Sequence, residues 1–429
     1  MKRTLISILF SALPFFGVSA SAETPETAAG TENRYHISFW NYQPTGLIDE
    51  TKAVRDWKDC GINLPMTFEY DPARHDKARM LSLLDKCQEQ GMQAIVCDAR
   101  TTYRRLMAVG EKEFRKGVRE AMEDFGGHPA VFGFHVGDEP DAPAWEYAVT
   151  AFRIVQEAGP ELTAFLNMFP YWEEPNFAEV LGCDGTMDGY AEKLADFVRR
   201  SGAKIISFDS YGQCAYFQRE YYQDIHMKCL NIFSRVAKET GAELFVSLLS
   251  VGHWGYRVPT RDDIRWQLFS AIAHGATGIH WFQFYESPGP CGSYRESPVN
   301  RYGERTPTYT SLSAENRNFM HLFSGKLSRC TFDSVSHYGR PFGNFPLFDG
   351  SQELTRIEPV INTDISLAVT RWIDEDGDPC YTVTSLEREL PTKIRVFFEA
   401  EGPLKGKYFE GWLCPGQMLY IDKDGLWNA

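Results

Sequence analysis

The stretch VFGFHVGDEP, residues 131–140, joins an apolar segment to two adjacent carboxylates and a proline. Apolar residues at this density, ending at Gly137 and Pro140, are typical of a buried strand that stops abruptly. Two neighbouring acids at such a strand end repel each other and lose hydration, so they do not favour folding. Helix capping is the structural alternative. Asp141 already provides an N-cap, because Ala142-Pro143 follows it, and this leaves Asp138 and Glu139 without a capping role.

Similar apolar segments recur from residue 35 to about residue 290. We expect strands at 35–40, 63–69, 93–98, 131–136, 162–168, 205–209, 244–249 and 278–284. We expect helices between them, at 48–58, 77–90, 111–125, 144–157, 190–201, 221–240 and 261–274, several of which end at a glycine. Eight alternating strand–helix units predict an α/β fold, a (β/α)8 TIM barrel. An open doubly wound sheet is the alternative, but no GxGxxG follows the first strand.

The pattern changes after the eighth expected strand. A loop rich in glycine, proline and serine leads to one expected helix at 313–327. Strand-like segments joined by an acidic, glycine-containing turn follow, at 365–372, 381–386, 393–398 and 417–421. We therefore expect a catalytic barrel over residues 33–328 and a small antiparallel β-sandwich over residues 329–429.

The first 22 residues have the pattern of a cleavable signal peptide. Lys2 and Arg3 precede an apolar run, and Ala20-Ser21-Ala22 is a small-residue cleavage site. The first cysteine is Cys60, so no lipid-anchor cysteine follows the run. We expect an exported protein, periplasmic or extracellular, and no other apolar run is long enough to cross a membrane.

The composition excludes some partners. With 58 acidic and 44 basic residues, the formal charge of the chain is −14, which argues against nucleic acid or another polyanion as the partner. Aromatic residues make up 14% of the chain, a high fraction for a soluble protein. The ten cysteines show no CxxC motif or repeated spacing that would define a disulfide framework.

Polar and aromatic residues occur where the expected strands end. Alternation along each strand predicts that these side chains face the barrel mouth, where barrel enzymes carry their active sites. The candidates are Trp40, Asp98, Glu139, Asn167, Asp209, Tyr211, His253, Trp254, Trp281 and Gln283. Glu286 follows the last strand with the opposite parity, and reaches the mouth only if the loop turns it inward. Ordinary core packing is the alternative for each single aromatic, Trp281 above all.

This set of residues favours a sugar over other ligands. The chain has no glycine-rich phosphate loop, HExxH motif, clustered metal ligands or GxSxG motif, so we expect neither a metal nor a cofactor. Acids, Asn and Gln can bind hydroxyl groups, and aromatic faces can pack on the C–H face of a neutral sugar. A carbohydrate is therefore the expected substrate.

Two motifs resemble those of known enzymes. Gly137-Asp138-Glu139-Pro140 resembles the acid/base motif of TIM-barrel glycoside hydrolases, usually Asn-Glu-Pro in clan A. The segment from Trp266-Gln267 through His274-Gly275-Ala276 to Phe282-Gln283 resembles the corresponding region of family 42 type β-galactosidases. The resemblance covers residues 36–290 and implies that Glu139 is the general acid/base.

The chain departs from the clan A pattern on the seventh expected strand. The clan places its nucleophile there, but residues 247–254 contain no acid. Asp209 or Glu286 can take that role. Alternatively, a 2-acetamido group of the substrate attacks while Asp138 orients it, an arrangement that resembles family 123 β-N-acetylgalactosaminidases with their adjacent Asp-Glu pair.

These observations together predict an exported glycoside hydrolase. A barrel that binds glycans without cleaving them is the main alternative, because the expected nucleophile is missing. A non-hydrolytic barrel enzyme such as a lyase is a further one. Sugar identity, linkage, exo or endo action and oligomeric state are left open by the sequence.

Overall fold

A computed structural model of the chain describes residues 33–287 and 294–428. The expected signal peptide lies outside these described residues. From Asn33 onward the chain forms one compact unit.

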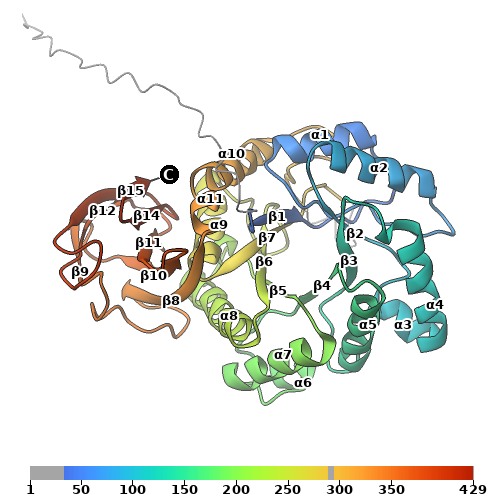
Figure 1. The fold of residues 1–429 in the computed structure, drawn as a ribbon, viewed down its shortest axis with the longest axis horizontal. Coiled ribbons are helices and arrows are strands. Elements are labelled where there is room, and N and C mark those ends of the chain that lie inside the picture. The colour runs from blue at the N-terminus through green and yellow to red at the C-terminus, as the bar shows by residue number, and fades with distance from the viewer. Residues whose placement is uncertain (1–32, 288–293, 429) are drawn as a thin grey trace, which may run out of the picture. The chain divides into compact units, whose positions relative to one another are not determined.

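A parallel sheet of seven strands curves around the centre of the first part of this unit (Figure 1). Its strands are β1 (His36–Phe39), β2 (Ala94–Val96), β3 (Val131–Asp138), β4 (Thr163–Met168), β5 (Ile205–Asp209), β6 (Glu243–Leu249) and β7 (Ala276–Phe282). Their order is β1-β7-β6-β5-β4-β3-β2, so the first strand pairs with the last. A sheet whose first and last strands pair is closed into a barrel, in contrast to an open doubly wound sheet.

The eighth position of the barrel, between β1 and β2, is filled by residues 63–69. This segment was expected to be a regular strand, but it forms only isolated bridges. Its backbone still bonds to both neighbours: Leu64 N donates to Ile37 O at 3.1 Å, and Thr67 N donates to Ile95 O at 2.9 Å. Pro65 lacks an N–H group and interrupts a regular ladder. The predicted (β/α)8 barrel is confirmed, with one irregular strand.

Helices surround the sheet (Figure 1). They are α1 (Glu50–Asp59), α2 (Lys77–Glu89), α3 (Tyr103–Val109), α4 (Glu111–Ala121), α5 (Trp145–Ala158), α6 (Phe177–Leu181), α7 (Met187–Ser201), α8 (Arg219–Thr240) and α9 (Arg261–Ala273). The short helices α3 and α6 were not expected from the sequence. The expected helix at 111–125 is divided, because its last turn is a π-helix over Met122–Gly126.

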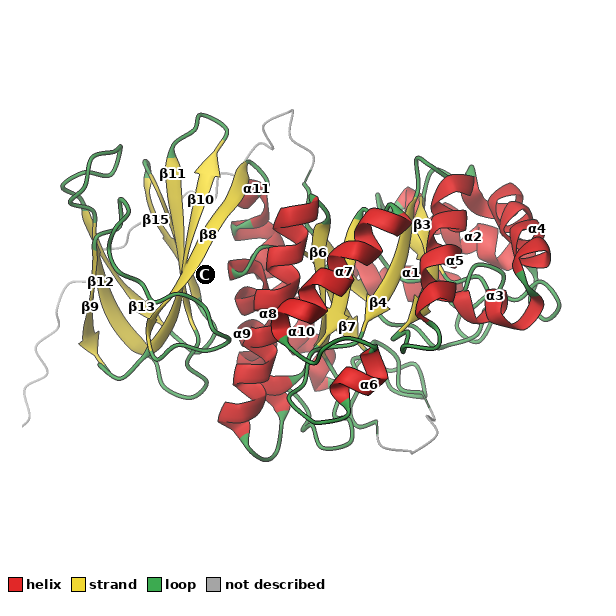
Figure 2. Ribbon diagram, turned by 90° about the horizontal axis from the view of Figure 1, so that it is seen from below, coloured by secondary structure: helices red, strands yellow, loops and turns green. Residues whose placement is uncertain are grey.

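Two antiparallel sheets follow α10 (Pro307–Leu322) and α11 (Ser324–Leu327). One contains β8 (Cys330–Gly339), β10 (Ser366–Asp374), β11 (Pro379–Ser385), β14 (Met418–Asp422) and β15 (Gly425–Asn428). The other contains β9 (Arg356–Ile361), β12 (Thr392–Phe397) and β13 (Tyr408–Leu413). Figure 2 shows the two sheets face to face, and their inner residues form a common core that includes Leu367, Val383 and Ile394. The predicted C-terminal β-sandwich is confirmed.

The sandwich packs on the barrel through α9. The indole Nε1 of Trp266 donates to Leu386 O at 3.0 Å, and the Thr370 hydroxyl donates to Ala273 O at 2.7 Å. Trp266, which belongs to the second resemblance motif, therefore has a structural role at this junction. Over the described parts of the chain, no helix combines the length and apolar character that a membrane span requires.

Candidate active site

A bulge at the end of β3 directs the Asp-Glu pair. The register between β3 and β4 shifts between His135 and Gly137, and Glu139 N continues the pairing by donating to Asn167 O at 2.9 Å. Gly137 has a φ of 153°, and a Cβ at this position would lie 2.3 Å from the Tyr103 ring. Only glycine fits this turn.

Glu139 itself has a φ of 45°, which is costly for any residue other than glycine. The Tyr103 hydroxyl donates to Asp138 O at 2.8 Å, and this bond stabilises the strained backbone next to Glu139. Strain of this kind is concentrated at functional sites, where the surrounding structure keeps a side chain in one orientation. The backbone therefore fixes the direction of both carboxylates.

Asn167, near the end of β4, links two of the acids. Its amide nitrogen Nδ2 lies 3.2 Å from Asp138 Oδ1 and 2.9 Å from Asp209 Oδ1, so one NH2 group donates to both carboxylates. Its oxygen Oδ1 accepts a hydrogen bond from the Ser207 hydroxyl at 3.1 Å, which fixes the orientation of the amide. Asn167 is 1% exposed, so its bonds are shielded from water.

The side chains of Glu139 and Asp209 lie close enough to shift each other's pKa by sharing a proton. Burial raises the pKa of Glu139 well above its usual range, and the nearby charges of Asp209 and Asp138 raise it further. Burial also raises the pKa of Asp209, but bonds from Asn167, Tyr211 and Glu139 oppose this shift by stabilising its charged form. One proton shared in this pair therefore resides on Glu139, and Asp209 carries the charge.

Burial, together with the charge of Asp209, raises the pKa of Asp138 as well, and the bond from Asn167 only partly offsets this. Arg104 acts on both Asp138 and Glu139 and lowers their pKa values, but less than burial raises them. Among the described residues that line the cavity, none is a lysine or arginine. The site is therefore acidic and poor in compensating positive charge.

The acids open into a cavity of about 330 Å³ at the carboxyl ends of the barrel strands. Its lining consists of the three acids, Asn167, one histidine and aromatic residues: Trp40, Tyr42, Asp138, Glu139, Asn167, Asp209, Tyr211, His253, Trp254, Tyr256, Phe282 and Tyr294. This volume suits one or two sugar rings. The structure thus brings together eight of the twelve residues singled out from the sequence.

Aromatic side chains form one wall of this cavity. The ring of His253 stacks between Trp254, with centroids 4.6 Å apart, and Tyr294, with centroids 4.8 Å apart. Tyr211 stacks on Phe282 at 5.7 Å. The Trp40 ring stacks on Tyr42 with centroids 5.8 Å apart, and its indole donates to the Ser247 hydroxyl at 3.4 Å, which fixes the ring in the cavity lining. Acids beside flat apolar faces are the combination that a sugar ring requires.

Four predicted site residues lie outside the cavity. Asp98 is ion-paired with Arg100 at 2.7 Å and lines a smaller cavity of about 190 Å³ that shares Trp40 and Tyr42. The Gln283 amide donates to the Ser287 hydroxyl at 3.2 Å. Glu286 forms an ion pair with Arg301.

The fourth, Trp281, is fully buried, and its Nε1 donates to Asn316 of α10 at 3.0 Å. Tyr285 was expected to share the inward face with Trp281, but its hydroxyl accepts a hydrogen bond from Trp57 Nε1 of α1 at 2.9 Å, also on the helix side of the sheet. The expected parity of this strand is therefore inverted: His280 and Phe282 face inward. Aromatic residues occupy both faces of β7, so the sequence carried no signal to orient it.

The inverted parity accounts for one missed cavity residue, Phe282. Tyr256 and Tyr294 were missed because they lie in loops, where strand alternation does not apply. Tyr42 shares the parity of Trp40, so the alternation of the first strand predicts it at the barrel mouth, and it lines the cavity.

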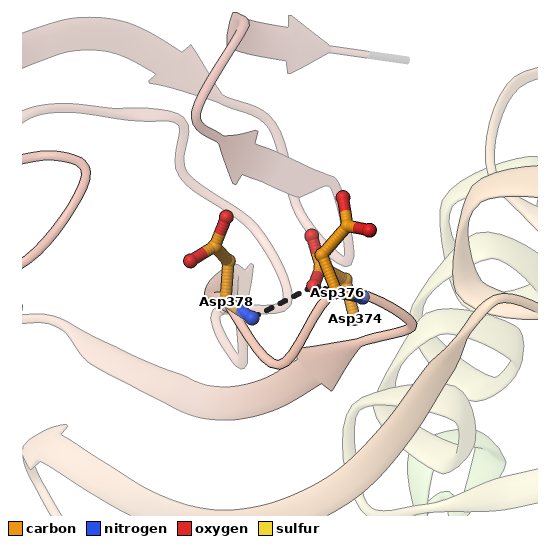
Figure 3. Close-up of side chains that lie close together, drawn as sticks. All are labelled: Asp374, Asp376 and Asp378. Atoms are coloured by element: carbon orange, nitrogen blue, oxygen red, sulfur yellow. Dashed lines mark hydrogen bonds between the residues drawn. The ribbon is translucent and has the colours of Figure 1, made fainter.

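One group of three acids in the described ranges has the spacing of a metal site, and it lies in the sandwich. Asp374, Asp376 and Asp378 occupy the turn between β10 and β11, where Asp378 N donates to Asp374 Oδ1 at 2.8 Å (Figure 3). The Lys423 ammonium lies 2.8 Å from Asp376 and 3.1 Å from Asp378 and provides the compensating positive charge. This cluster is separate from the barrel cavity.

Comparisons with known proteins show the fold. No protein-family profile and no curated protein sequence matches the chain. Among solved structures, a β-galactosidase from the psychrophilic Marinomonas ef1 aligns with a TM-score of 0.51 and 12% identity, over 69% of this chain and 62% of that one. A family 42 β-galactosidase from G. stearothermophilus aligns with a TM-score of 0.52 and 13% identity, over 70% of this chain and 57% of that one.

A cold-adapted β-galactosidase from Rahnella sp. R3 gives a TM-score of 0.52 at 12% identity, over 70% of this chain and 58% of that one. The matched region thus spans between 57% and 62% of the length of these three enzymes. At this identity the likeness is one of fold, and it confirms the predicted resemblance to glycoside-hydrolase barrels of the family 42 type. The resemblance to family 123 stays a prediction.

Proposed function

We propose that this protein is a glycoside hydrolase in which Glu139 protonates the leaving oxygen and Asp209 is the second carboxylate. The observation that supports it most is that both carboxyl groups line one aromatic cavity at the barrel mouth, close enough to shift each other's pKa. The predicted signal peptide leads us to propose that the enzyme acts after export. The fold shared with β-galactosidases is consistent with this proposal.

The protonation states suit hydrolysis. A glycosidase requires one carboxylic acid that still holds its proton near neutral pH and one charged carboxylate nearby. Burial and neighbouring charge raise the pKa of Glu139, while donors from Asn167 and Tyr211 favour the charged form of Asp209. Glu139 is therefore the acid and Asp209 the carboxylate of the pair.

The contact between the two carboxyl groups favours retention of configuration. Inverting enzymes hold their carboxyl groups about 6.5–9.5 Å apart to admit a water, whereas retaining enzymes hold them about 5–5.5 Å apart. Carboxyl groups in contact are closer than in either class and nearest to the retaining spacing, so retention is the proposed outcome. Asp209 would attack the anomeric carbon as the C–O bond breaks and the Glu139 proton passes to the departing oxygen. Water, deprotonated by Glu139, would then release the sugar from Asp209.

Asp138 supports a second route, restricted to 2-acetamido sugars. It lies beside Glu139, and Asn167 orients its carboxylate in the same network. In that route Asp138 would orient the substrate's acetamido group, whose oxygen attacks in place of Asp209.

Aryl glycosides with and without 2-acetamido groups test the proposal. We expect hydrolysis of at least one, and a loss of about a thousandfold or more in Glu139→Gln. The loss should be far smaller for a dinitrophenyl leaving group, because such a group departs without protonation. Glu286→Gln is the matched control, since Glu286 is an acid after β7 that lies outside the cavity and pairs with Arg301. Full activity of Glu139→Gln on poor leaving groups would rule out its assignment.

Azide separates the two routes. If Asp209 is the nucleophile, azide should restore turnover in Asp209→Gly and yield a glycosyl azide of inverted configuration. If the acetamido group attacks, only acetamido substrates are cleaved, and Asp138→Asn is the more damaging change.

A further inference from the structure

Three aromatic side chains stand exposed beside the cavity. Tyr216, Phe217 and Trp254 expose 51%, 78% and 63% of their surfaces. We call these three residues the aromatic rim. Tyr216 and Phe217 come from the loop after β5, and Trp254 comes from the loop after β6. Both loops leave the carboxyl ends of adjacent strands, so the rim lies on the same side of the barrel as the acids.

Backbone hydrogen bonds join the two loops. Tyr216 N donates to Gly255 O at 3.1 Å, and Arg257 N donates to Cys214 O at 2.9 Å. Between them Ala215 and Tyr256 form an antiparallel bridge. The rings of Tyr216 and Phe217 have centroids 6.3 Å apart. The rim is therefore a fixed surface, with little conformational entropy to lose on binding.

Trp254 is placed at a cost to folding. It lies in a tight turn closed by two hydrogen bonds between His253 and Tyr256, of 3.0 and 2.7 Å, and its φ is 44°. Glycine or asparagine is the usual residue for this conformation. The strained backbone gains little burial in return, because most of the indole is in water. A large apolar ring held in this way indicates a binding surface.

We propose that the aromatic rim binds the sugar units of a glycan chain that extend beyond the unit held in the cavity. This inference rests on the proposed function. Trp254 lines the cavity as well as the rim, so one surface leads continuously from the acids outward. The rim residues carry no charge, which suits stacking on the C–H faces of neutral pyranose rings.

A second copy of the chain is a poorer fit to the rim. An aromatic side chain offers about 150–250 Å² of contact area. The three rim residues together therefore offer less than the roughly 800 Å² that each partner buries in a standard protein interface. The substrate class is therefore a neutral oligosaccharide or polysaccharide chain.

Calorimetry on Glu139→Gln, which prevents turnover, measures the effect of chain length. The probes are matched di- and tetrasaccharides: cellobiose and cellotetraose, mannobiose and mannotetraose, galactobiose and galactotetraose, and chitobiose and chitotetraose. For at least one sugar we expect the tetrasaccharide to bind about tenfold more tightly than the disaccharide, as two further stacked rings would give.

Adding Tyr216→Ala and Phe217→Ala should abolish this advantage and leave disaccharide affinity unchanged. Tyr408→Ala is the control, because Tyr408 is an aromatic residue of β13 that is 62% exposed. The inference is overturned if no tetrasaccharide binds, if no tetrasaccharide binds more tightly than its disaccharide, or if the advantage persists in the double variant. A shift from dimer to monomer in the double variant would assign the rim to self-association and would also overturn it.

Different results would refute the proposed function and the proposed role of the rim. Hydrolysis of aryl monoglycosides requires the cavity but not Tyr216 or Phe217, so its absence in the wild-type protein would refute the enzyme and leave the binding result standing. Normal hydrolysis without length dependence would refute the rim alone.

Discussion

Two groups of three acids in the described part of the chain differ in their surroundings, and this gives them opposite properties. Asp138, Glu139 and Asp209 lie in the barrel cavity, where burial raises the pKa of each. Asp374, Asp376 and Asp378 lie in a turn of the sandwich (Figure 3), where the Lys423 ammonium lowers the pKa of Asp376. Removing carboxylates from water without a cation keeps a proton on one of them, which is what acid catalysis needs. Pairing with a lysine at the surface instead favours the charged form of Asp376.

The largest expected effect tests whether the barrel acids act as a unit. Asp209→Asn removes the charge opposite Glu139, and we expect kcat to fall by about a thousandfold or more because no carboxylate then faces the anomeric carbon. The pKa of Glu139 should fall at the same time, since the charge of Asp209 helps to raise it. Titration of Glu139 by NMR in both proteins measures this. An unchanged pKa would show that the two groups are not coupled.

Asn167 offers a test of the hydrogen-bond network. Asn167→Leu removes the amide that serves both Asp138 and Asp209. Leaving two buried acceptors unsatisfied should lower the free energy of unfolding by about 1–3 kcal/mol, and activity should fall by about ten- to a hundredfold. Asn316→Leu is a comparison variant, because Asn316 bonds the structural Trp281 and should affect stability without a change in the pH profile. Equal effects on the pH profile would argue against a role for Asn167 in the site.

The pH dependence of stability distinguishes the two groups of acids. A carboxyl group whose pKa is raised on folding binds more protons in the folded state, so its contribution to stability is lost as pH rises above about 4.3, the unfolded value for Glu. Glu139→Gln has no such charge to bury. Its Tm should therefore exceed that of the wild type at pH 8, and the difference should shrink at pH 5. Thermal unfolding at both pH values measures this, and an identical difference would contradict the raised pKa.

The smallest effect is expected in the sandwich. Lys423→Met removes the ammonium that pairs with Asp376 and Asp378. Exposed ion pairs add little stability, so we expect a Tm within about 1–2 °C of the wild type and unchanged hydrolysis of aryl glycosides. A large loss of stability would show that this turn depends on its charge balance as much as the cavity does.

The sequence predicted the fold because the barrel repeats one local pattern. Each strand is a short apolar segment, and several helices end at a glycine, so the eight units are visible without tertiary information. The same local logic singled out Glu139, although one part of it was wrong: the N-cap of α5 is Ala144, not Asp141. Asp141 Oδ1 accepts a bond from Ala144 N at 3.0 Å in the preceding turn, so Asp141 still orders the start of the helix and Asp138 and Glu139 have no such role.

Only the tertiary structure decided which acid faces Glu139. Asp209 is 70 residues away in the chain, and contact between them depends on how β3, β4 and β5 align and on the bulge at Gly137. The inward side of β7 was equally undetermined, because Trp281 and Phe282 are both apolar and only packing against α10 selects between them. Local periodicity defines strands and caps, whereas register and parity between distant strands are fixed by packing. For this reason the sequence could name Glu139 as the candidate acid but left Asp138, Asp209 and Glu286 open as its partner.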